Sequence, residues 1–472
     1  MSEPGVDLCG EHLREECGVF GMYNADHLDT SMLPYIALHA LQHRGQESAG
    51  VAVSDGTVVS HYKAMGLVSE VFTPEVLRKF EHQRIAVGHV RYSTSGGKDV
   101  AINAQPIVGH YQNGTIALAH NGTLINASAL AEKLKFYGSV IQTDLDSEMI
   151  MHLIARYASL ELPDLLRECM KKLQGAYAVV LMNQNTLAGF RDPLGIRPLV
   201  LGQIKNSYIL TSESCALDAI GARYVRDISP GEVVIIDEAG LHSYPAERSC
   251  KGNVCVFEYV YLARPDSIID GESVYQARMR AGEMLAKIAP VEADVVGGVP
   301  DSALPSAAGY AKATGIPYGD VLVKNRYVGR TFIQPTQELR ELSVRLKLNA
   351  MRANVEGKRI VLIDDSIVRG TTSKRIVGLL RSAGAKEVHL RIASPPVTHP
   401  CYFGIDTPTK ENLISANLST EEICRRLGAD SLAFLTDEAL RATVPQCRLG
   451  LCTACFDGRY PVPIEQQPVP IS

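Results

Sequence analysis

Apolar residues in the first half of the chain fall in short runs that predict a β-rich unit. Runs of strand length recur at intervals, whereas helical spacing is found in only a few segments. Many strands with few helices indicate sheets packed between helix layers. The predicted strands are Cys17–Met22, Arg84–Tyr92, Thr115–Ala119, Ala176–Leu181, Leu199–Leu201, Tyr208–Leu210 and Val233–Ile236, and the predicted helices include Leu33–Leu41 and one opened by Asp144–Glu148.

In the second half, strands alternate with helices. Ala293–Val299 is a strand of the buried type, and Arg359–Ile363 is a second apolar, β-branched run. Thr371–Arg381 then has helical spacing, and Glu387–Ala393 is the next strand. This order predicts a βαβ unit in a parallel sheet, in which ligands bind at the carboxyl ends of the strands.

A polar, irregular segment, Glu247–Asn253, separates the two patterns. A chain of 472 residues is too long for one ordinary core, and its length suggests two or three domains. We therefore predict an α/β protein with one domain over residues 17–250 and a second over residues 251–472.

Composition narrows the classes of protein to which the chain could belong. With 46% hydrophobic and 21% charged residues it resembles a soluble globular protein, and a net charge of −5 argues against a general nucleic-acid surface. No apolar run reaches the length of a membrane span, and the acidic start of the chain is neither a secretory signal nor a transit peptide. Eleven cysteines in such a chain favour reduced thiols, metal ligation or catalysis. We expect a cytoplasmic enzyme.

The loop after Ile363 carries the most specific chemistry. Asp364 and Asp365 stand at the carboxyl end of a predicted strand, and Gly370 allows close approach of a ligand to the backbone. The hydroxyls and N–H groups of Thr371, Thr372 and Ser373 then open a helix, where a phosphate is favoured. The acids suit ribose hydroxyls or a bound Mg²⁺. An ordinary strand–turn–helix with solvated acids is the plainer alternative, and the loop is neither a Walker loop nor a dinucleotide fingerprint.

The whole string Val361–Lys374 resembles the phosphoribosylpyrophosphate (PRPP) loop of type I phosphoribosyltransferases. That resemblance implies that Ser302 joins Asp364 and Asp365 around Mg²⁺ and the pyrophosphate. The PRPP-binding residues that it implies are Asp301, Ser302, Lys324, Arg326, Asp364, Asp365, Ser366, Arg369, Gly370, Thr371, Thr372 and Ser373.

The segment from Lys324 to Lys347 is cationic and includes Arg330, Arg340 and Arg345. One interpretation is a solvated loop. The other is a mobile lid that closes over the pyrophosphate and excludes water.

Four motifs of the first half resemble the glutaminase domain of class II, N-terminal-nucleophile amidotransferases. They are Cys17-Gly-Val-Phe-Gly, His43-Arg-Gly-Gln-Glu, Arg91-Tyr-Ser-Thr and His120-Asn-Gly-Thr-Leu. The resemblance implies an αββα sandwich in which Cys17 attacks glutamine. Its α-amino group can act as a base only if residues 1–16 are a propeptide that is removed.

The same resemblance implies roles for five further residues. Asn121 and Gly122 would form the oxyanion hole. Arg91 would bind the α-carboxylate of glutamine and Asp146 its α-ammonium group, with Thr94 lining the pocket. Surface ion pairing is the alternative for Arg91 and Asp146.

Cys255–Ser267 is close to a string found in glutamine PRPP amidotransferases, the family that opens purine biosynthesis. This resemblance implies that ammonia released from glutamine attacks C1 of PRPP and gives 5-phosphoribosylamine, glutamate and pyrophosphate. It also implies inhibition by purine nucleotides and a homotetramer.

Cys452 and Cys455 have metal-ligand spacing, which alone is compatible with zinc, a redox pair or no function. Some members of the resembled family hold a [4Fe–4S] cluster on cysteines that match Cys255, Cys401, Cys452 and Cys455. Cys447 is the nearest rival ligand.

Two other functions compete with this interpretation. A hexosamine synthase would carry sugar-isomerase features in place of the PRPP loop. A non-catalytic PRPP-binding regulator would need neither Cys17 nor Asn121 nor Arg91.

Overall fold

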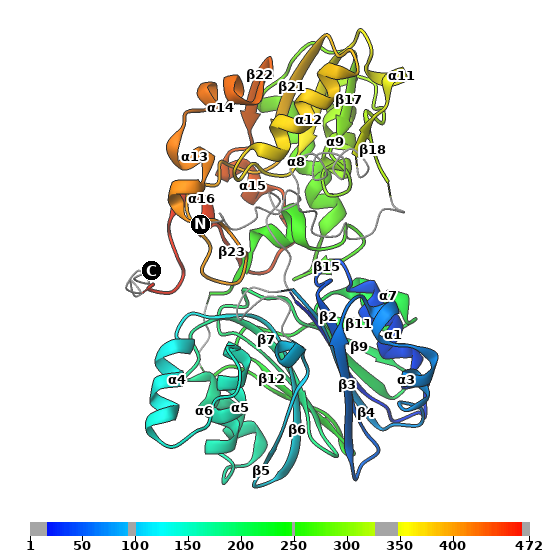
Figure 1. Cartoon of the computed structure of the whole chain (residues 1–472), viewed down its shortest axis with the longest axis vertical. Coiled ribbons are helices and arrows are strands. Elements are labelled where there is room, and N and C mark those ends of the chain that lie inside the picture. Colours follow the sequence, from blue (N-terminus) through cyan, green and yellow to red (C-terminus); the bar gives the residue numbers. More distant parts are fainter. Residues whose placement is uncertain (1–16, 93–100, 248–250, 326–347, 465–472) are drawn as a thin grey trace, which may run out of the picture.

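In the computed structural model, residues 17–92, 101–247, 251–325 and 348–464 are described. The first half forms two facing antiparallel sheets, which occupy the lower part of Figure 1. In spatial order, the first sheet is β11 (Arg223–Asp227), β9 (Val200–Ile204), β10 (Ser207–Thr211), β1 (Gly18–Tyr23), β4 (Ile85–Arg91), β2 (Ser48–Ser54) and β3 (Val59–Met65). The second is β13 (Gly240–Tyr244), β12 (Val233–Asp237), β8 (Leu187–Arg191), β7 (Gly175–Met182), β6 (Gly114–Leu124) and β5 (Ile107–Tyr111).

Helices cover the outer face of each sheet, so the first half has four layers (Figure 1). Apolar side chains fill the space between the sheets, including Val19, Val87 and Val180. Separate clusters join each sheet to its helices. The helices are α1 (Met32–Ala40), α2 (Val68–Val71), α3 (Pro74–Arg78) and α7 (Ser214–Ala219) on the first sheet, and α4 (Ala127–Phe136), α5 (Asp146–Arg156) and α6 (Leu162–Met170) on the second. The predicted αββα sandwich is confirmed.

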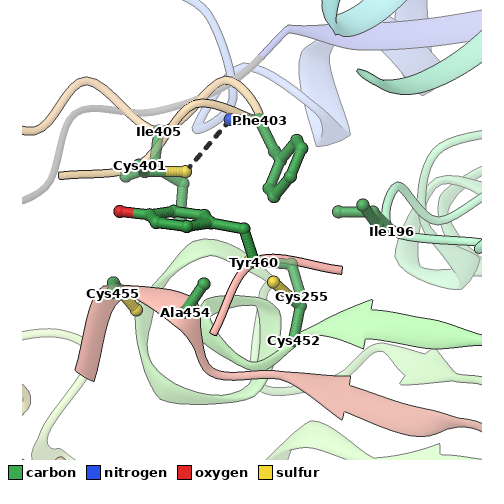
Figure 2. Close-up of a pocket in the computed structure, with 9 residues that line it drawn as sticks. All are labelled: Ile196, Cys255, Cys401, Phe403, Ile405, Cys452, Ala454, Cys455 and Tyr460. Atoms are coloured by element: carbon green, nitrogen blue, oxygen red, sulfur yellow. Dashed lines mark hydrogen bonds between the residues drawn. The ribbon is translucent and has the colours of Figure 1, made fainter. Parts of the chain in front are cut away.

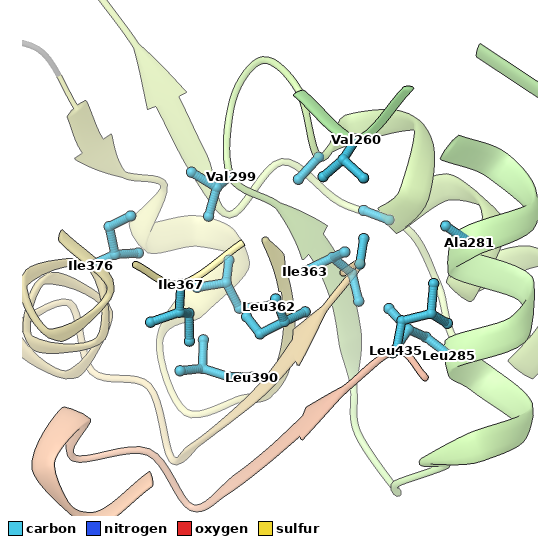
Figure 3. Close-up of a cluster of buried hydrophobic side chains, with 14 of the residues drawn as sticks. Val260, Ala281, Leu285, Val299, Leu362, Ile363, Ile367, Ile376, Leu390 and Leu435 are labelled. Carbon is cyan, nitrogen blue, oxygen red and sulfur yellow. The ribbon is translucent and has the colours of Figure 1, made fainter. Parts of the chain in front are cut away.

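A four-stranded parallel sheet forms the centre of the second half. The side chains of Leu362, Ile363 and Leu390 pack between it and the flanking helices (Figure 3). The strands, in spatial order, are β17 (Val295–Gly298), β20 (Arg359–Asp364), β21 (Glu387–Ile392) and β22 (Ser431–Phe434). The helices include α8 (Val274–Ile288), α9 (Leu304–Thr314), α11 (Arg352–Val355), α12 (Thr371–Ser382), α13 (Ile414–Asn417), α14 (Thr420–Leu427), α15 (Asp437–Ala442) and α16 (Ala454–Asp457).

Short elements connect this sheet to the rest of the molecule. β14 (Asn253–Cys255), at the start of the second half, pairs in parallel with β23 (Gly450–Cys452), near its end. A π-helix, η2 (Glu258–Leu262), follows β14 directly. The remaining strand pairs are β15 (Ile268–Ile269) with β16 (Glu272–Ser273) and β18 (Leu322–Lys324) with β19 (Leu348–Ala350). No helix of the described ranges is both long and apolar enough to cross a membrane.

Candidate active sites and cysteine cavity

Cys17 directly precedes β1, at the end of the first sheet where β4 finishes. β1 and β4 are antiparallel with Gly18 opposite Val90, which puts Cys17 beside Arg91, the last residue of β4. The Cys17 thiol donates a hydrogen bond to the carbonyl of Tyr92 at 3.4 Å. Pairing of the two strands thus holds the thiol next to one of the predicted substrate ligands.

Arg91 is buried, with 2% of its surface exposed. Its Nη1 lies 3.3 Å from Oε1 of Glu47, which is also buried. The backbone N–H of Glu47 donates to the carbonyl of Arg91 at 3.1 Å. Surface ion pairing therefore does not describe Arg91, because its guanidinium is desolvated and has a buried carboxylate beside it.

Asn121 and Gly122 lie in β6 of the facing sheet. Nε2 of His89 in β4 lies 3.0 Å from the carbonyl oxygen of His120, so the two sheets meet beside Asn121. The side chain of Asn121 is fully buried, yet its Nδ2 and Oδ1 find no hydrogen-bond partner among the described residues. Buried amides are normally paired, so an orphaned one at a proposed site is consistent with a role in ligand binding.

Asp146 begins α5 and is buried against the same strand. Its Oδ2 accepts a hydrogen bond from the N–H of Leu124 at 2.9 Å, and its Oδ1 lies 3.6 Å from Nδ1 of His120. Burial acts to raise the pKa of Asp146, but His120 and the N–H of Leu124 outweigh it and leave the pKa below the usual range. The carboxylate is thus kept ionised inside the domain and is no surface group.

In the second half, Asp364 and Asp365 are both buried at the carboxyl end of β20. The hydroxyls of Ser302 and Ser366 donate to the two oxygens of the Asp365 carboxylate. Burial, followed by the charge of Asp365, raises the pKa of Asp364 well above its usual value. The structure therefore brings Ser302, from the turn between β17 and α9, to the acid pair at the carboxyl end of β20.

The predicted phosphate loop has the expected backbone. Gly370 caps α12 with φ of +81°, a conformation that L side chains rarely adopt. Thr371, Thr372 and Ser373 form the first turn of α12. The exposed residue Arg369 precedes them.

Lys324, at the end of β18, lies near the same edge of the sheet. Its ammonium group pairs with the carboxylate of Asp301 at 2.7 Å, and both side chains are largely exposed to solvent. This ion pair is therefore within reach of an incoming ligand.

Four cysteines from three separate segments of the chain line a single cavity (Figure 2). They are Cys255, Cys401, Cys452 and Cys455, and the register of β14 with β23 places Cys255 directly opposite Cys452. Burial raises the pKa of Cys452 to about 12 and that of Cys455 well above its usual value, with the neighbouring cysteines adding to the effect in Cys455.

Tyr460 also lines this cavity. Its ring lies between Cys401 and the other three cysteines in the view of Figure 2, and its hydroxyl donates to the carbonyl of Pro400 at 2.6 Å. Cys447 is absent from the lining; its thiol donates instead to the carbonyl of Leu449. Within the described ranges, no three His, Cys, Asp or Glu side chains converge closely enough to hold a single metal ion.

Several predicted residues lie outside the described ranges. They are Thr94, Arg326, Arg330, Arg340, Arg345 and residues 1–16, so the predicted lid and propeptide are untested.

Comparison with known proteins agrees with both halves. A family model for a glutamine amidotransferase domain matches residues 89–219, and one for a phosphoribosyl transferase domain matches residues 271–393. The amidophosphoribosyltransferase of Bacillus subtilis is 49% identical over 97% of this chain and 96% of that protein. The chain belongs to the amidophosphoribosyltransferase family. Another member, from Synechococcus elongatus, is 50% identical over 96% of this chain and 92% of its own length.

Solved structures of the amidophosphoribosyltransferase family have the same fold. The B. subtilis glutamine PRPP amidotransferase complexed with ADP and GMP superposes with a TM-score of 0.89 at 48% identity, covering 96% of this chain and 99% of that one. A structure described as the allosteric regulatory enzyme of purine biosynthesis gives 0.90, also at 48% identity, covering 96% and 98%. The chain is thus an amidophosphoribosyltransferase-family enzyme of purine biosynthesis, and neither the hexosamine synthase nor the non-catalytic regulator is supported.

Some residues of these sites were not predicted. Glu47 and Arg44 belong to the His43–Glu47 motif. Nothing in the local sequence indicates that Glu47 pairs with Arg91, or that Arg44 pairs with a carboxylate of the other half. His120 precedes the predicted oxyanion residues, and its contact with Asp146 depends on α5 packing against β6.

Proposed function

We propose that Cys17 carries out the glutaminase half of the amidophosphoribosyltransferase reaction. Its thiolate attacks the side-chain carbonyl carbon of glutamine, ammonia leaves, and water hydrolyses the resulting thioester to glutamate. The N–H of Gly122 and the amide of Asn121 stabilise the oxyanion of each tetrahedral intermediate. The observation that carries this proposal is the meeting of Cys17, Arg91 and the unpartnered Asn121 at the junction of two facing sheets.

Two charged side chains bind the α-carboxylate and the α-ammonium group of glutamine. Arg91 binds the α-carboxylate and Asp146 the α-ammonium group, and Thr94 lines the pocket. Support comes from the burial of both charged side chains and from the lowered pKa of Asp146, because a buried carboxylate that stays ionised can pair with an ammonium group. Residues 1–16 act as a propeptide whose removal frees the α-amino group of Cys17. An intact mass that begins at Cys17 in active enzyme is the expected result.

PRPP binds at the carboxyl edge of the parallel sheet. Ser366, Arg369, Gly370, Thr371, Thr372 and Ser373 bind its 5-phosphate and ribose, and Asp301, Ser302, Lys324 and Arg326 its pyrophosphate side. Two buried acids and a hydroxyl form a set of hard oxygen donors, which suits Mg²⁺. Ser302, Asp364 and Asp365 would hold this ion, which, when bound, neutralises charge that develops on the leaving pyrophosphate. Ammonia attacks C1 as the C1–pyrophosphate bond breaks, which gives 5-phosphoribosylamine.

The cysteine cavity would hold a [4Fe–4S] cluster, on Cys255, Cys401, Cys452 and Cys455, with a structural role. The four thiols fit because they are soft ligands gathered in an otherwise apolar cavity. Cluster binding would require deprotonation of thiols whose pKa burial has raised.

Anaerobically purified protein with Cys452→Ser is expected to lose its cluster absorbance, whereas Cys447→Ser retains it. Equal absorbance in the two variants contradicts the ligand assignment. We also propose that removal of residues 1–16 depends on the cluster. Loss of these residues from a folded Cys452→Ser, Cys455→Ser variant would refute that dependence.

The finer properties of the family extend to this chain as proposals. The glutaminase domain comprises residues 17–250 and the phosphoribosyltransferase domain residues 251–472. Purine nucleotides inhibit the enzyme, in keeping with the nucleotides bound to the B. subtilis relative. It forms a homotetramer, which light scattering tests. It works in the cytoplasm, in keeping with the fact that none of the nine cysteines of the described ranges forms a disulfide.

The decisive variant for the glutaminase proposal is Cys17→Ser. It is expected to abolish synthesis of 5-phosphoribosylamine from glutamine and to leave synthesis from ammonium chloride unchanged. Loss of both activities would contradict the assignment of Cys17 to the glutaminase half alone.

A further inference from the structure

A carboxylate of the second half, Glu258, lies fully buried between two arginines of the first half. Nη1 and Nη2 of Arg44 both donate to it, the first at 3.3 Å. Nη1 of Arg197 lies 3.8 Å from Oε1 of the same carboxylate. All three side chains have exposed fractions of 0% or 1%, so this cluster of charges is sealed from water.

The backbone next to Arg44 contacts Arg91, the residue proposed to bind the α-carboxylate of glutamine. The next residue, Gly45, packs against Arg91 so closely that a Cβ on Gly45 would lie 2.5 Å from the Arg91 carbonyl carbon. Nε of Arg44 also donates to Glu213, a buried carboxylate that accepts hydrogen bonds from the N–H of Arg264 and the hydroxyl of Ser267. Arg44 is therefore fixed by carboxylates on two sides, with its backbone beside the proposed glutamine clamp.

Arg197, the second arginine beside Glu258, contacts a loop that packs against the proposed oxyanion hole. Its Nη2 donates to the carbonyl of Phe403, in the loop that carries Cys401. A Cβ on the next residue, Gly404, would lie 3.5 Å from the carbonyl carbon of Gly122 and 3.2 Å from the hydroxyl of Thr123. Through the two arginines, Glu258 is thus linked to the surroundings of Arg91 and to those of Gly122.

On its other side, the π-helix that begins at Glu258 is joined to the PRPP edge of the sheet. Arg278 of α8 donates to the carbonyls of Tyr259 and Ala263, at 2.7 and 2.8 Å. The hydroxyl of Ser306 in α9 donates to the carbonyl of Arg278 at 2.9 Å. α9 follows directly on Ser302, which donates to Asp365.

We propose that Glu258 is a positioning residue through which the phosphoribosyltransferase half controls the geometry of the glutaminase site. A buried carboxylate shared by two guanidinium groups has few alternative arrangements, because any movement leaves a desolvated charge unpaired. π-Helices, moreover, occur frequently at functional sites. Displacement of the π-helix when PRPP binds would shift Arg44 and Arg197 together, and with them the backbones beside Arg91 and Gly122.

This inference rests on the proposed roles of Arg91, Asn121 and Gly122, and it differs from a purely structural role for the same ion pairs. A structural role predicts loss of stability and of every activity in parallel. A positioning role predicts loss of the response of glutaminase to PRPP while synthesis from ammonia persists.

The test compares Glu258→Gln, which keeps the shape and one acceptor oxygen, with wild type and with Glu232→Gln. The control replaces a buried carboxylate that pairs with Arg226 within the first half. For each protein, glutamate release is measured with and without PRPP and Mg²⁺, together with ammonia-dependent synthesis and the KM for glutamine. A coupling of typical size changes affinity about 5- to 150-fold.

We expect Glu258→Gln to lower the stimulation of glutamate release by PRPP at least about fivefold and to raise the KM for glutamine, with ammonia-dependent synthesis within about twofold of wild type. Glu232→Gln should keep the wild-type stimulation. Unchanged stimulation in Glu258→Gln, or a parallel loss of ammonia-dependent synthesis, overturns the proposal.

If Glu258→Gln does not fold, Arg44→Lys serves in its place, because lysine keeps the charge but cannot reach both Glu213 and Glu258 with a planar fork. The same two outcomes then apply. If PRPP does not stimulate glutamate release by the wild type, the coupling of the two halves itself is refuted. If PRPP stimulates the wild type and the variant equally, only the role of Glu258 is refuted.

Discussion

At the scale of single residues, polar groups in arrangements that lower stability are found at the positions proposed to carry the chemistry. The amide of Asn121 is buried without a partner among the described residues, and Asp364 and Asp365 are two neighbouring buried acids. Each arrangement is unfavourable in a protein without ligands. Under the proposed function, each would become favourable once an oxyanion or a cation is bound, which is the expected property of a site built for its transition state.

Replacing Asn121 with alanine tests this at the glutaminase site. We expect kcat for glutamate release to fall by about 10²–10³-fold, as on loss of an oxyanion donor, with little change in the denaturant midpoint. The matched control is Asn183→Ala. Oδ1 of Asn183 accepts hydrogen bonds from the N–H groups of Asn185 and Thr186, so its loss should cost stability, about 1 kcal/mol, and no activity. An Asn121→Ala enzyme with wild-type kcat would contradict the assignment.

Replacing Asp364 with asparagine tests the acid pair. The raised pKa means that the folded protein keeps a proton on Asp364 above the usual carboxyl range, so stability without a cation falls as pH rises through that window. Asparagine removes the charge and retains the oxygen that accepts from the N–H of Asp365.

In buffer with EDTA, Asp364→Asn should therefore unfold at a higher temperature than wild type, by a few degrees for each ~1 kcal/mol gained. The difference should grow as the pH rises above the usual carboxyl range, and Mg²⁺ with PRPP should stabilise only the wild type. Calorimetry measures both effects. A variant that is less stable at every pH would contradict the proposed repulsion.

At the scale of elements, the sequence predicted those strands and helices whose positions follow from the local spacing of apolar residues. The apolar run before Asp364 and the helical spacing after Gly370 gave β20 and α12 to within a residue or two, because each is specified by its own pattern. Pairing between distant segments was not predictable in this way. The register of β14 with β23, which brings Cys255 opposite Cys452, depends on long-range packing, and the cysteine set came from family resemblance.

Gly122 shows how an element constrains the site, and Gly122→Ala is the corresponding prediction. Its φ is +133°, and a Cβ would lie 2.0 Å from the carbonyl oxygen of Ala176 in β7. We expect the substitution to separate β6 from β7, to lower the free energy of unfolding by at least ~2 kcal/mol and to abolish glutamate release.

Gly138→Ala is the control, since Gly138 also has a positive φ of +89° but no atom within 4 Å of the added Cβ. The free energy of unfolding of Gly138→Ala should fall only by the cost of the backbone strain, which is smaller. Equal losses of stability in the two variants, measured by urea denaturation, would show that the contact with Ala176 is unimportant.

At the scale of the whole molecule, the two halves have separate sheets but share a buried boundary. Motifs and family resemblance predicted both sites, yet gave no sign that Arg44 and Arg197 of one half enclose Glu258 of the other. Such a contact between halves has no local signature, because each of these residues would also suit a solvated surface. Family resemblance predicted that the two reactions occur in one enzyme, and the structure adds buried ion pairs that join the two halves.

The most direct test of the account is glutamate release by anaerobically purified protein, with and without PRPP and Mg²⁺, with pyrophosphate measured in the same reaction. Fusion of the two sites in one chain makes sense if ammonia passes from one to the other before it escapes. We predict strong stimulation of glutamate release by PRPP, with pyrophosphate formed in a one-to-one ratio to glutamate. Glutamate release that is indifferent to PRPP, or pyrophosphate that lags far behind glutamate, would contradict the coupling of the two halves.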